Sequence, residues 1–277
     1  MTEWGNPRVD VGAYLGRVGL GEEWLAEPTA EALRELHRAH VLSLPFENID
    51  VALGRPVNLD PGAIQEKLVT HRRGGVCHEH NLLFAAVLEH AGYAVRRVLT
   101  RVHDDGKVLL PRGHSSLLVD VEDETWLCDV GYGSDGILEP VPLSATTVQQ
   151  GEWVFELDRF HDGWRLRSAD RTVLYSVNDV TYRRPDFEVA AYFLLTHPRS
   201  PFATSLVVQR VTDEARYALR NLDLAVTHPD GGRVEERITP AALPSVLSGI
   251  FGIEIGRAEA DEVGAFIERH AAVEIPL

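Results

Sequence analysis

Residues 73–81 read Arg-Gly-Gly-Val-Cys-His-Glu-His-Asn, so two adjacent glycines precede a cysteine. Adjacent glycines let the backbone turn sharply and approach a ligand closely. A helix is predicted from about Cys77 to Glu89, ending at Gly92. Cys77 then falls in the first helical turn, where unpaired N–H groups and the helix dipole favour an anion. A thiol in that position ionises more readily, and the thiolate is the attacking species.

The same N–H groups would stabilise an oxyanion on a bound acyl group, which makes Cys77 a candidate nucleophile. A buried structural thiol after a loop is the alternative interpretation. The chain holds two cysteines, too few for a disulfide framework or a four-thiolate zinc site. Cys77, His78 and His80 lie close together in sequence, but no Cys-x-x-Cys or His-x-x-x-His motif completes a metal site. We therefore expect no metal.

Upstream of the glycines the pattern is helical, and residues 1–92 are predicted to form a helical domain that carries the nucleophile. Asp10 precedes a short periodic stretch, and a second helix is expected from about Pro28 to His40. Asp60-Pro61 is a helix start, with an N-cap carboxylate followed by proline at the first helical position.

Downstream the pattern changes to short strands, and residues 93–182 are predicted to form a small barrel or a strongly bent sheet. Glu122-Asp123-Glu124 and Asp162-Gly163 are turn sequences of hairpin type between these strands. The expected strands are Ala94–Val102, His114–Val121, Thr125–Val130, Trp153–Phe160, Trp164–Arg167 and Thr172–Val180.

The remaining residues, 183–277, mix both patterns and are predicted to form a third domain. Helices are expected at Asp186–Leu195 and Asp261–His270, with strands at Ser205–Gln209 and Tyr217–Thr227. Pro229-Asp230-Gly231-Gly232 is a strong turn signal. We expect the three domains to share interfaces.

Composition narrows the class of protein. The 277 residues are 44% hydrophobic and 25% charged, which is ordinary for a globular protein, and the net charge is −15. Such a negative field repels nucleic acid and anionic membranes, so neither is expected as a partner. No apolar run approaches the length of a membrane span, and no secretory signal is visible. A cytoplasmic location is the expectation.

Two further residues complete a candidate catalytic group. His114 begins a predicted strand, and Asp129 ends another beside Gly131 and Gly133. His114 would take the thiol proton from Cys77, and Asp129 would orient the imidazole. Because side chains alternate along a strand, Cys128 should point away from Asp129 into the core. Spacing alone does not select this histidine and this aspartate.

Several segments together resemble the arylamine N-acetyltransferase family. Residues 73–81 resemble its active-site signature, Arg-Gly-Gly-x-Cys-x-Glu-x-Asn. Leu44–Asp50, containing Pro-Phe-Glu-Asn, resembles a family segment upstream, and Thr196–Phe202 is similar to its Ser-Pro-Phe segment. The segments that begin at His114 and Asp129 resemble those bearing the catalytic histidine and aspartate. All lie in family order between residues 44 and 202.

The resemblance implies an α+β fold: an N-terminal helical bundle, a central β-barrel and a C-terminal α/β lid around a cysteine-protease-like Cys-His-Asp core. It also implies a ping-pong mechanism with acetyl-CoA as co-substrate. Cys77 would take the acetyl group and release CoA. An arylamine, arylhydrazine or hydroxyarylamine would then attack the thioester, with His114 handling protons.

The resemblance also assigns pocket residues. Phe46, Tyr132 and Phe202 match the pocket aromatics of the family, and ordinary core packing is the alternative interpretation. Gly131 and Gly133 would leave room for the pantetheine arm and the acyl group. Arg73 and Glu79 are expected to be structural, as a buried pair that orients the Cys77 loop.

Two departures concern the pocket. His78 stands where the family usually has an apolar or aromatic residue, and Tyr132 stands where phenylalanine is common.

Other functions remain open at this stage. Relatives of the family act as amide synthases, which close a macrolactam by passing a polyketide acyl chain through the same cysteine. A thiol hydrolase or transglutaminase-like enzyme would use the same Cys-His-Asp order, and a binding module could keep the fold without catalysis. The acceptor, the acyl donor and the oligomeric state are not encoded in any motif that we identify.

Overall fold

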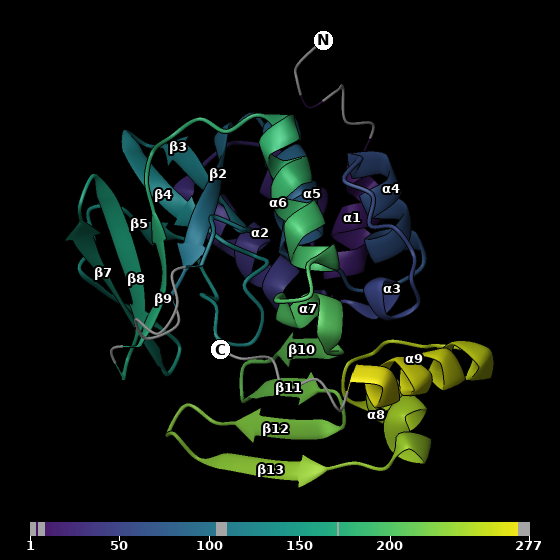
Figure 1. The fold of residues 1–277 in the computed structure, drawn as a ribbon. Coiled ribbons are helices and arrows are strands. Elements are labelled where there is room, and N and C mark those ends of the chain that lie inside the picture. Colours follow the sequence, from purple (N-terminus) through teal and green to yellow (C-terminus); the bar gives the residue numbers. More distant parts are fainter. Residues whose placement is uncertain (1–3, 5–8, 104–109, 171, 271–277) are drawn as a thin grey trace.

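The elements of the chain follow the expected α+β order: helices first, then a long antiparallel sheet, then a mixed unit (Figure 1). The computed structural model describes residue 4 and residues 9–103, 110–170 and 172–270. In these ranges no helix is long and apolar enough to cross a membrane.

Side-chain caps begin the first helices where the sequence places them. Asp10 accepts a hydrogen bond from the Ala13 N–H, and Asp60 accepts from Gly62 and Ala63. The helical elements are α1 (Val11–Val18), a 3-10 turn (Glu22–Leu25), α2 (Ala30–Ser43), α3 (Ile49–Ala52), α4 (Pro61–Gln65), a π-helical turn (Glu66–Thr70) and α5 (Cys77–His90).

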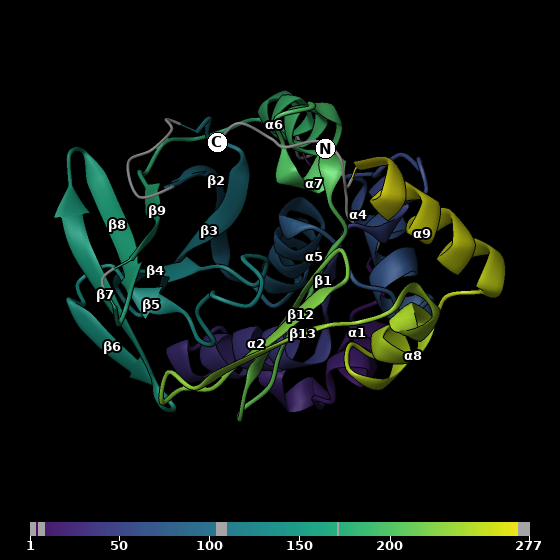
Figure 2. The same ribbon diagram turned by 60° about the horizontal axis from the view of Figure 1, so that its bottom comes forward.

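Helix α5 is the central helix of the molecule. Every residue from Cys77 to Leu88 is buried, as expected for a helix that is covered on all sides. Figure 2 shows it surrounded by α2, β3 and α6 (Arg184–Thr196). The nucleophile candidate therefore lies at the start of the most enclosed helix described.

In the described residues, eight antiparallel strands form a sheet in the order β5-β4-β3-β2-β9-β8-β7-β6. Its strands are β2 (Ala94–Val102), β3 (His114–Val121), β4 (Glu124–Cys128), β5 (Val141–Pro142), β6 (Thr147–Gln150), β7 (Trp153–Phe160), β8 (Gly163–Ser168) and β9 (Val173–Val177).

The two edge strands of this sheet, β5 and β6, are neighbours in the chain. A flat sheet of eight strands would separate its edges by roughly 34 Å, whereas the four residues between β5 and β6 reach about 18 Å at most. The sheet must therefore curve strongly toward closure, as the sequence predicts. Gln150 fastens the curved edge, because its side chain donates to the Glu139 carbonyl at 2.7 Å and accepts from the Leu138 N–H at 2.7 Å.

The C-terminal part contains a five-stranded sheet, β1-β10-β11-β12-β13. Its first strand, β1 (Phe46–Glu47), comes from the helical part of the chain and pairs with Val208 and Gln209 of β10. The other elements are α7 (Pro201–Thr204), β10 (Val207–Val211), β11 (Arg216–Arg220), β12 (Asp223–Thr227), β13 (Arg233–Arg237), a 3-10 turn (Pro240–Ala242), α8 (Leu243–Gly249) and α9 (Arg257–His270).

Two predicted strands of this part differ from the structure in extent. The strand predicted at Ser205–Gln209 is β10, which begins and ends two residues later, at Val207–Val211. Tyr217–Thr227 divides into β11 and β12, because Asn221 adopts a φ of 55° and reverses the chain there. The turn predicted at Pro229–Gly232 joins β12 to β13, with Gly231 at a φ of 86°.

The hydrophobic cores cross the expected domain limits. One core joins the helices to one face of β3 and β4, and it includes Phe187 and Ala190 of α6. A second fills the bent sheet, and a third joins Ile49 and Ala52 of α3 to the C-terminal sheet, α8 and α9. The limits at residues 92 and 182 stay a prediction.

Candidate active site

The loop before Cys77 lies directly against β1. A Cβ atom on Gly74 would come within 2.1 Å of the Pro45 carbonyl oxygen. The Glu47 N–H donates to the Gly75 carbonyl at 2.9 Å, and the Gly75 N–H donates to Pro45 at 3.3 Å. Gly74 therefore lets the loop approach the backbone at Pro45, just before β1, because a side chain would not fit there, and the expected approach to a ligand stays a prediction.

The predicted ion pair between Arg73 and Glu79 is wrong. Arg73 instead contacts Glu47, whose carboxylate is fully buried, at 3.0 Å. Glu79 pairs with Lys67 at 2.9 Å and accepts the N–H of Val76, the residue before Cys77, at 2.9 Å. Arg73 and Glu79 therefore both stabilise the loop before Cys77, but each does so through another residue and not through an ion pair with the other.

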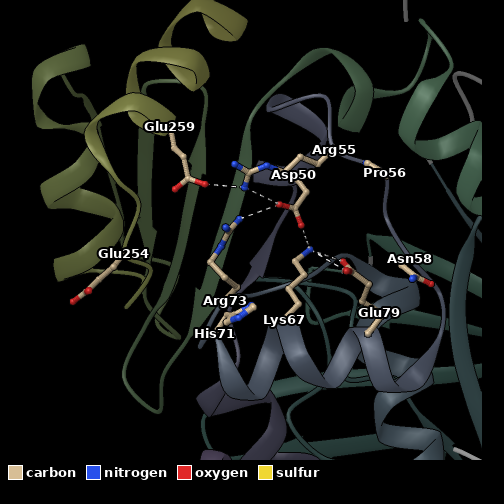
Figure 3. Close-up of a pocket in the computed structure, with 11 residues that line it drawn as sticks. Asp50, Arg55, Pro56, Asn58, Lys67, His71, Arg73, Glu79, Glu254 and Glu259 are labelled. Atoms are coloured by element: carbon tan, nitrogen blue, oxygen red, sulfur yellow. Dashed lines mark hydrogen bonds and ion pairs between the residues drawn. The ribbon is translucent and has the colours of Figure 1, made fainter.

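These ion pairs continue along a polar cleft of about 460 Å³ (Figure 3). Lys67 lies between Glu79 and Asp50, at 2.8 Å from the latter. Arg55 lies between Asp50 and Glu259 of α9, at 2.7 Å from Glu259. A chain of alternating charges therefore connects the C-terminal helix to the start of α5.

Cys77 at the start of α5, His114 at the start of β3 and Asp129 just after β4 come together in the structure. All three are buried, with 5%, 6% and 1% of their surface exposed, respectively. His114 Nε2 lies 2.6 Å from Asp129 Oδ2, which leaves Nδ1 as the ring nitrogen available to the Cys77 thiol.

The Asp129 carboxylate is held rigidly. Its Oδ1 atom accepts from the Gly131 N–H at 3.0 Å and from the side chain of Asn81 at 3.1 Å. Asn81 also donates to the carbonyls of Cys77 and Ser115. One amide group on α5 thus orients the nucleophile, the histidine strand and the carboxylate together.

The charges of the three groups reinforce one another. Burial alone would lower the pKa of His114, but the charge and hydrogen bond of Asp129 raise it to about 10. Burial alone would raise the pKa of Asp129, but His114, Asn81 and the Gly131 N–H lower it. Burial likewise opposes ionisation of Cys77, and the two imidazoles of His78 and His114 overcome it and lower the pKa of the thiol. The favoured state is a thiolate beside an imidazolium.

Comparisons with known proteins identify the family of this chain. A family model described as N-acetyltransferase matches residues 29–260. An arylamine N-acetyltransferase from Mycolicibacterium smegmatis is 39% identical over 93% of this chain and 96% of that protein. This chain belongs to the arylamine N-acetyltransferase family.

Solved structures of the arylamine N-acetyltransferase family have the same fold. The enzyme from Nocardia farcinica superposes with a TM-score of 0.89 at 38% identity, covering 96% of this chain and 98% of that one. The Mycobacterium marinum enzyme in complex with CoA superposes with a TM-score of 0.85 at 34% identity, covering 94% and 99%. The predicted α+β fold class is confirmed.

Two of the three predicted pocket aromatics meet beside the thiol of this family member. Phe46 and Phe202 have ring centroids 5.6 Å apart and belong to one apolar cluster with Cys77 and Val76. The ring of Tyr132 lies 5.2 Å from that of His114. Their roles in substrate binding stay predictions.

The two glycines assigned to the donor are close to protein atoms. A Cβ atom on Gly131 would lie 2.9 Å from the Cys77 Cα and 2.7 Å from Asn81, so this glycine lets the Asp129 loop pack on α5. Gly133 has a φ of 95°, and a Cβ atom there would lie 1.9 Å from Gln209. The expected contacts of both glycines with a donor stay predictions.

Cys128 is fully buried in the core shared by the helices and β4, on the face opposite Asp129, as predicted. His80 points away from the thiol. Its Nε2 donates to the Pro45 carbonyl at 3.2 Å, and its Nδ1 lies 2.9 Å from His40 Nε2. The described residues contain no cluster of metal-ligand side chains.

Two residues near the reacting groups were not assigned a role from sequence. Tyr175 of β9 lies with its ring 5.4 Å from that of His114. The other is His78, whose Nδ1 lies 3.3 Å from the sulfur of Cys77. A histidine next to the cysteine was visible in the sequence, whereas no motif marked Tyr175.

Proposed function

We propose that this protein moves an acetyl group from acetyl-CoA to an arylamine, arylhydrazine or hydroxyarylamine nitrogen through a thioester on Cys77. The observation that carries this proposal is the buried Cys77 thiol beside His114, whose other ring nitrogen is 2.6 Å from Asp129. The names of the family relatives support the substrate class, and the Mycobacterium marinum complex supports CoA as the ligand released.

In the first half-reaction the Cys77 thiolate attacks the acetyl carbonyl carbon. The carbon–sulfur bond to CoA breaks, and the departing CoA sulfur takes the proton that His114 carries. Cys77 is left as a thioester and His114 as a neutral imidazole. Asp129 stabilises the imidazolium before transfer and fixes which ring nitrogen faces the sulfur.

In the second half-reaction the acceptor nitrogen attacks the thioester carbon. His114 Nδ1 takes a proton from that nitrogen as the bond to Cys77 breaks, which restores the thiolate–imidazolium pair. The intermediate is a thioester, so it stays reactive toward a weakly basic aromatic amine. Phe46 and Phe202 offer an apolar surface for an aromatic ring beside the sulfur.

Incubation with acetyl-CoA and an arylamine tests this proposal. We expect release of one free CoA thiol per acetylated arylamine, and a covalent acetyl-enzyme when the amine is omitted. Absence of CoA release would contradict the proposal. Transfer from a long polyketide thioester with cyclic amide product would instead identify an amide synthase, and rapid peptide cleavage would identify a thiol hydrolase.

A further inference from the structure

The loop that carries Asp129 begins and ends at one imidazole ring. This loop, residues 129–138, follows Cys128 at the end of β4. The Asp129 N–H donates to His37 Nε2 at 3.0 Å, and His37 Nδ1 lies 2.9 Å from the carbonyl oxygen of Leu138. One side chain of α2 therefore closes the base of the loop that carries the carboxylate.

These two partners fix the position of the hydrogen on the His37 ring. A carbonyl oxygen only accepts and a backbone N–H only donates, so Nδ1 carries the hydrogen and Nε2 offers its lone pair. The ring is fully buried, and burial lowers the pKa of His37 to about 4, so the ring is uncharged at neutral pH. It packs edge-to-face on Phe84 of α5, with ring centroids 5.7 Å apart. Both bonds therefore require one neutral tautomer, with the hydrogen on Nδ1.

Asp129 stands just beyond the residues that the sheet pairs. Strand β4 pairs with β3 as far as Cys128 and with β5 as far as Leu127. The Asp129 N–H comes next, in a residue that is only 1% exposed. A buried N–H without an acceptor is costly, and His37 supplies the acceptor. At this point the backbone is therefore held by a helix side chain and not by a neighbouring strand.

The side chain of Asp129 reaches His114 from that backbone position. Its Oδ2 atom lies 2.6 Å from His114 Nε2. Asn81 and the Gly131 N–H donate to the other oxygen, Oδ1, at 3.1 and 3.0 Å. Bonds to Oδ1 alone let the carboxylate pivot, so the short contact of Oδ2 depends on where the backbone is held. A shift of the Asp129 backbone would lengthen that contact and weaken it.

Resting on the proposed function, we infer that His37 is a positioning residue for acetyl transfer. It holds the backbone of Asp129, Asp129 holds the imidazolium of His114, and that imidazolium helps to keep the sulfur of Cys77 ionised. The effect of His37 on the sulfur passes through two other residues, so it must disappear when His114 is removed. A merely structural role would lower stability without this dependence.

Asparagine and glutamine substitutions separate the two bonds of His37. In His37→Asn the amide nitrogen takes the place of Nδ1 and keeps the bond to Leu138, whereas the acceptor for Asp129 is lost. In His37→Gln the amide oxygen takes the place of Nε2 and keeps the bond to Asp129, whereas the donor to Leu138 is lost. Each variant loses one hydrogen bond, so both should lower the thermal midpoint of unfolding by similar amounts. His71→Asn is the control, because the His71 side chain is 65% exposed.

The first measurement is the pH dependence of Cys77 alkylation by iodoacetamide. His37→Asn should raise the thiol pKa by about half a unit, because a weaker contact between Asp129 and His114 makes the imidazole easier to deprotonate. His37→Gln and His71→Asn should match the wild type. Equal thiol pKa values in His37→Asn and His37→Gln would overturn the inference. This measurement needs no acetyl transfer, so it stays informative even if the proposed function fails.

The second measurement repeats the titration in a His114→Ala background. There His37→Asn should leave the thiol pKa where His114→Ala alone puts it, because the path through the imidazole is gone. A further rise of about half a unit would show that His37 acts on Cys77 by another route, and it would overturn the positioning role.

Turnover and the tautomer of His37 complete the test. Turnover of acetyl-CoA with an arylamine should fall about three-fold in His37→Asn and stay near wild type in His37→Gln. Equal losses in both variants would overturn the positioning role, whereas a wild type without transfer would end only the proposed function. ¹⁵N NMR of the wild type should show a neutral His37 ring with its hydrogen on Nδ1. A hydrogen on Nε2 would overturn the inference even if neither variant folds.

Discussion

His114 Nε2 lies 2.6 Å from Asp129 Oδ2, so one nitrogen of this imidazole is already committed to a carboxylate. Only Nδ1 remains for the sulfur of Cys77, and the pKa of His114 is raised to about 10. The ring is therefore protonated at neutral pH, and it is oriented before any substrate binds. This preorganisation is the basis of the first prediction.

Replacing His114 by alanine should raise the pKa of the Cys77 thiol, because the hydrogen bond and the positive charge of the imidazole held by Asp129 are lost while those of His78 remain. Alkylation by iodoacetamide at pH 7 should then slow by about ten-fold or more. Asp129→Asn should also slow alkylation of Cys77, but by a smaller factor, since the imidazole of His114 remains. Unchanged alkylation in His114→Ala would contradict the proposed role of this residue.

Replacing Cys77 by serine should abolish acetyl transfer and leave the fold intact. A hydroxyl is slightly smaller than a thiol and is not ionised by these imidazoles, so the covalent step fails while packing persists. Turnover of arylamine and the thermal midpoint of unfolding are the two measurements. Cys128→Ser is the matched control, because this second thiol lies in the core and should change stability without changing the chemistry.

Lys67→Met should destabilise the protein by about 3 kcal/mol. The substitution keeps the length of the side chain but leaves Glu79, which is 2% exposed, and Asp50 without the cation between them. Denaturant unfolding measures the change. Arg233→Met is the control, since its pair with Glu235 is 57% and 68% exposed and should contribute no more than about 0.5 kcal/mol. Equal effects of both substitutions would contradict this account.

His80→Gln should weaken the dependence of stability on pH between pH 4.5 and 6.5. Burial lowers the pKa of His80 to about 4, so in this range the unfolded state binds a proton that the folded state does not. Stability therefore falls as pH falls, by about 1.4 kcal/mol per pH unit for this group. Glutamine still offers a donor to Pro45 and does not titrate.

Unfolding in urea at several pH values measures this slope. Burial raises the pKa of Glu79 to about 7, so Glu79 makes the protein more stable as the pH falls, which is the opposite effect. This contribution is the same in the wild type and in the variant. An unchanged slope in His80→Gln would show that His80 is charged in the folded protein.

Local signals in the sequence predicted local structure well. Asp60 caps α4, Glu122 and Asp123 form the turn between β3 and β4 with positive φ angles, and Gly231 lies in the turn between β12 and β13. Each of these features depends on a few adjacent residues. The choice of His114 and Asp129 as partners of Cys77 depended on the family resemblance, because the sequence contains many other histidines and acids that spacing alone does not exclude.

Long-range partners were not accessible from the pattern. Arg73 and Glu79 lie six residues apart and carry opposite charges, so a pair between them was a natural expectation. The structure gives each a partner elsewhere, because Arg73 contacts Glu47 and Glu79 contacts Lys67, which are distant in sequence from the glycine loop or lie on the element before it. The two-residue strand β1 was also missed, since it is too short for alternation to show.

The pairing of β1 with β10 has a consequence for how the protein is made. Phe46 touches Gly75 on one side and Gln209 on the other, so the loop that presents the thiol is bracketed by segments far apart in the chain. On the ribosome, residues 46 and 75 emerge early, but the strand that covers them is not translated until residue 211. The surroundings of Cys77 therefore cannot be complete until the chain has been made through β10, long after the thiol itself.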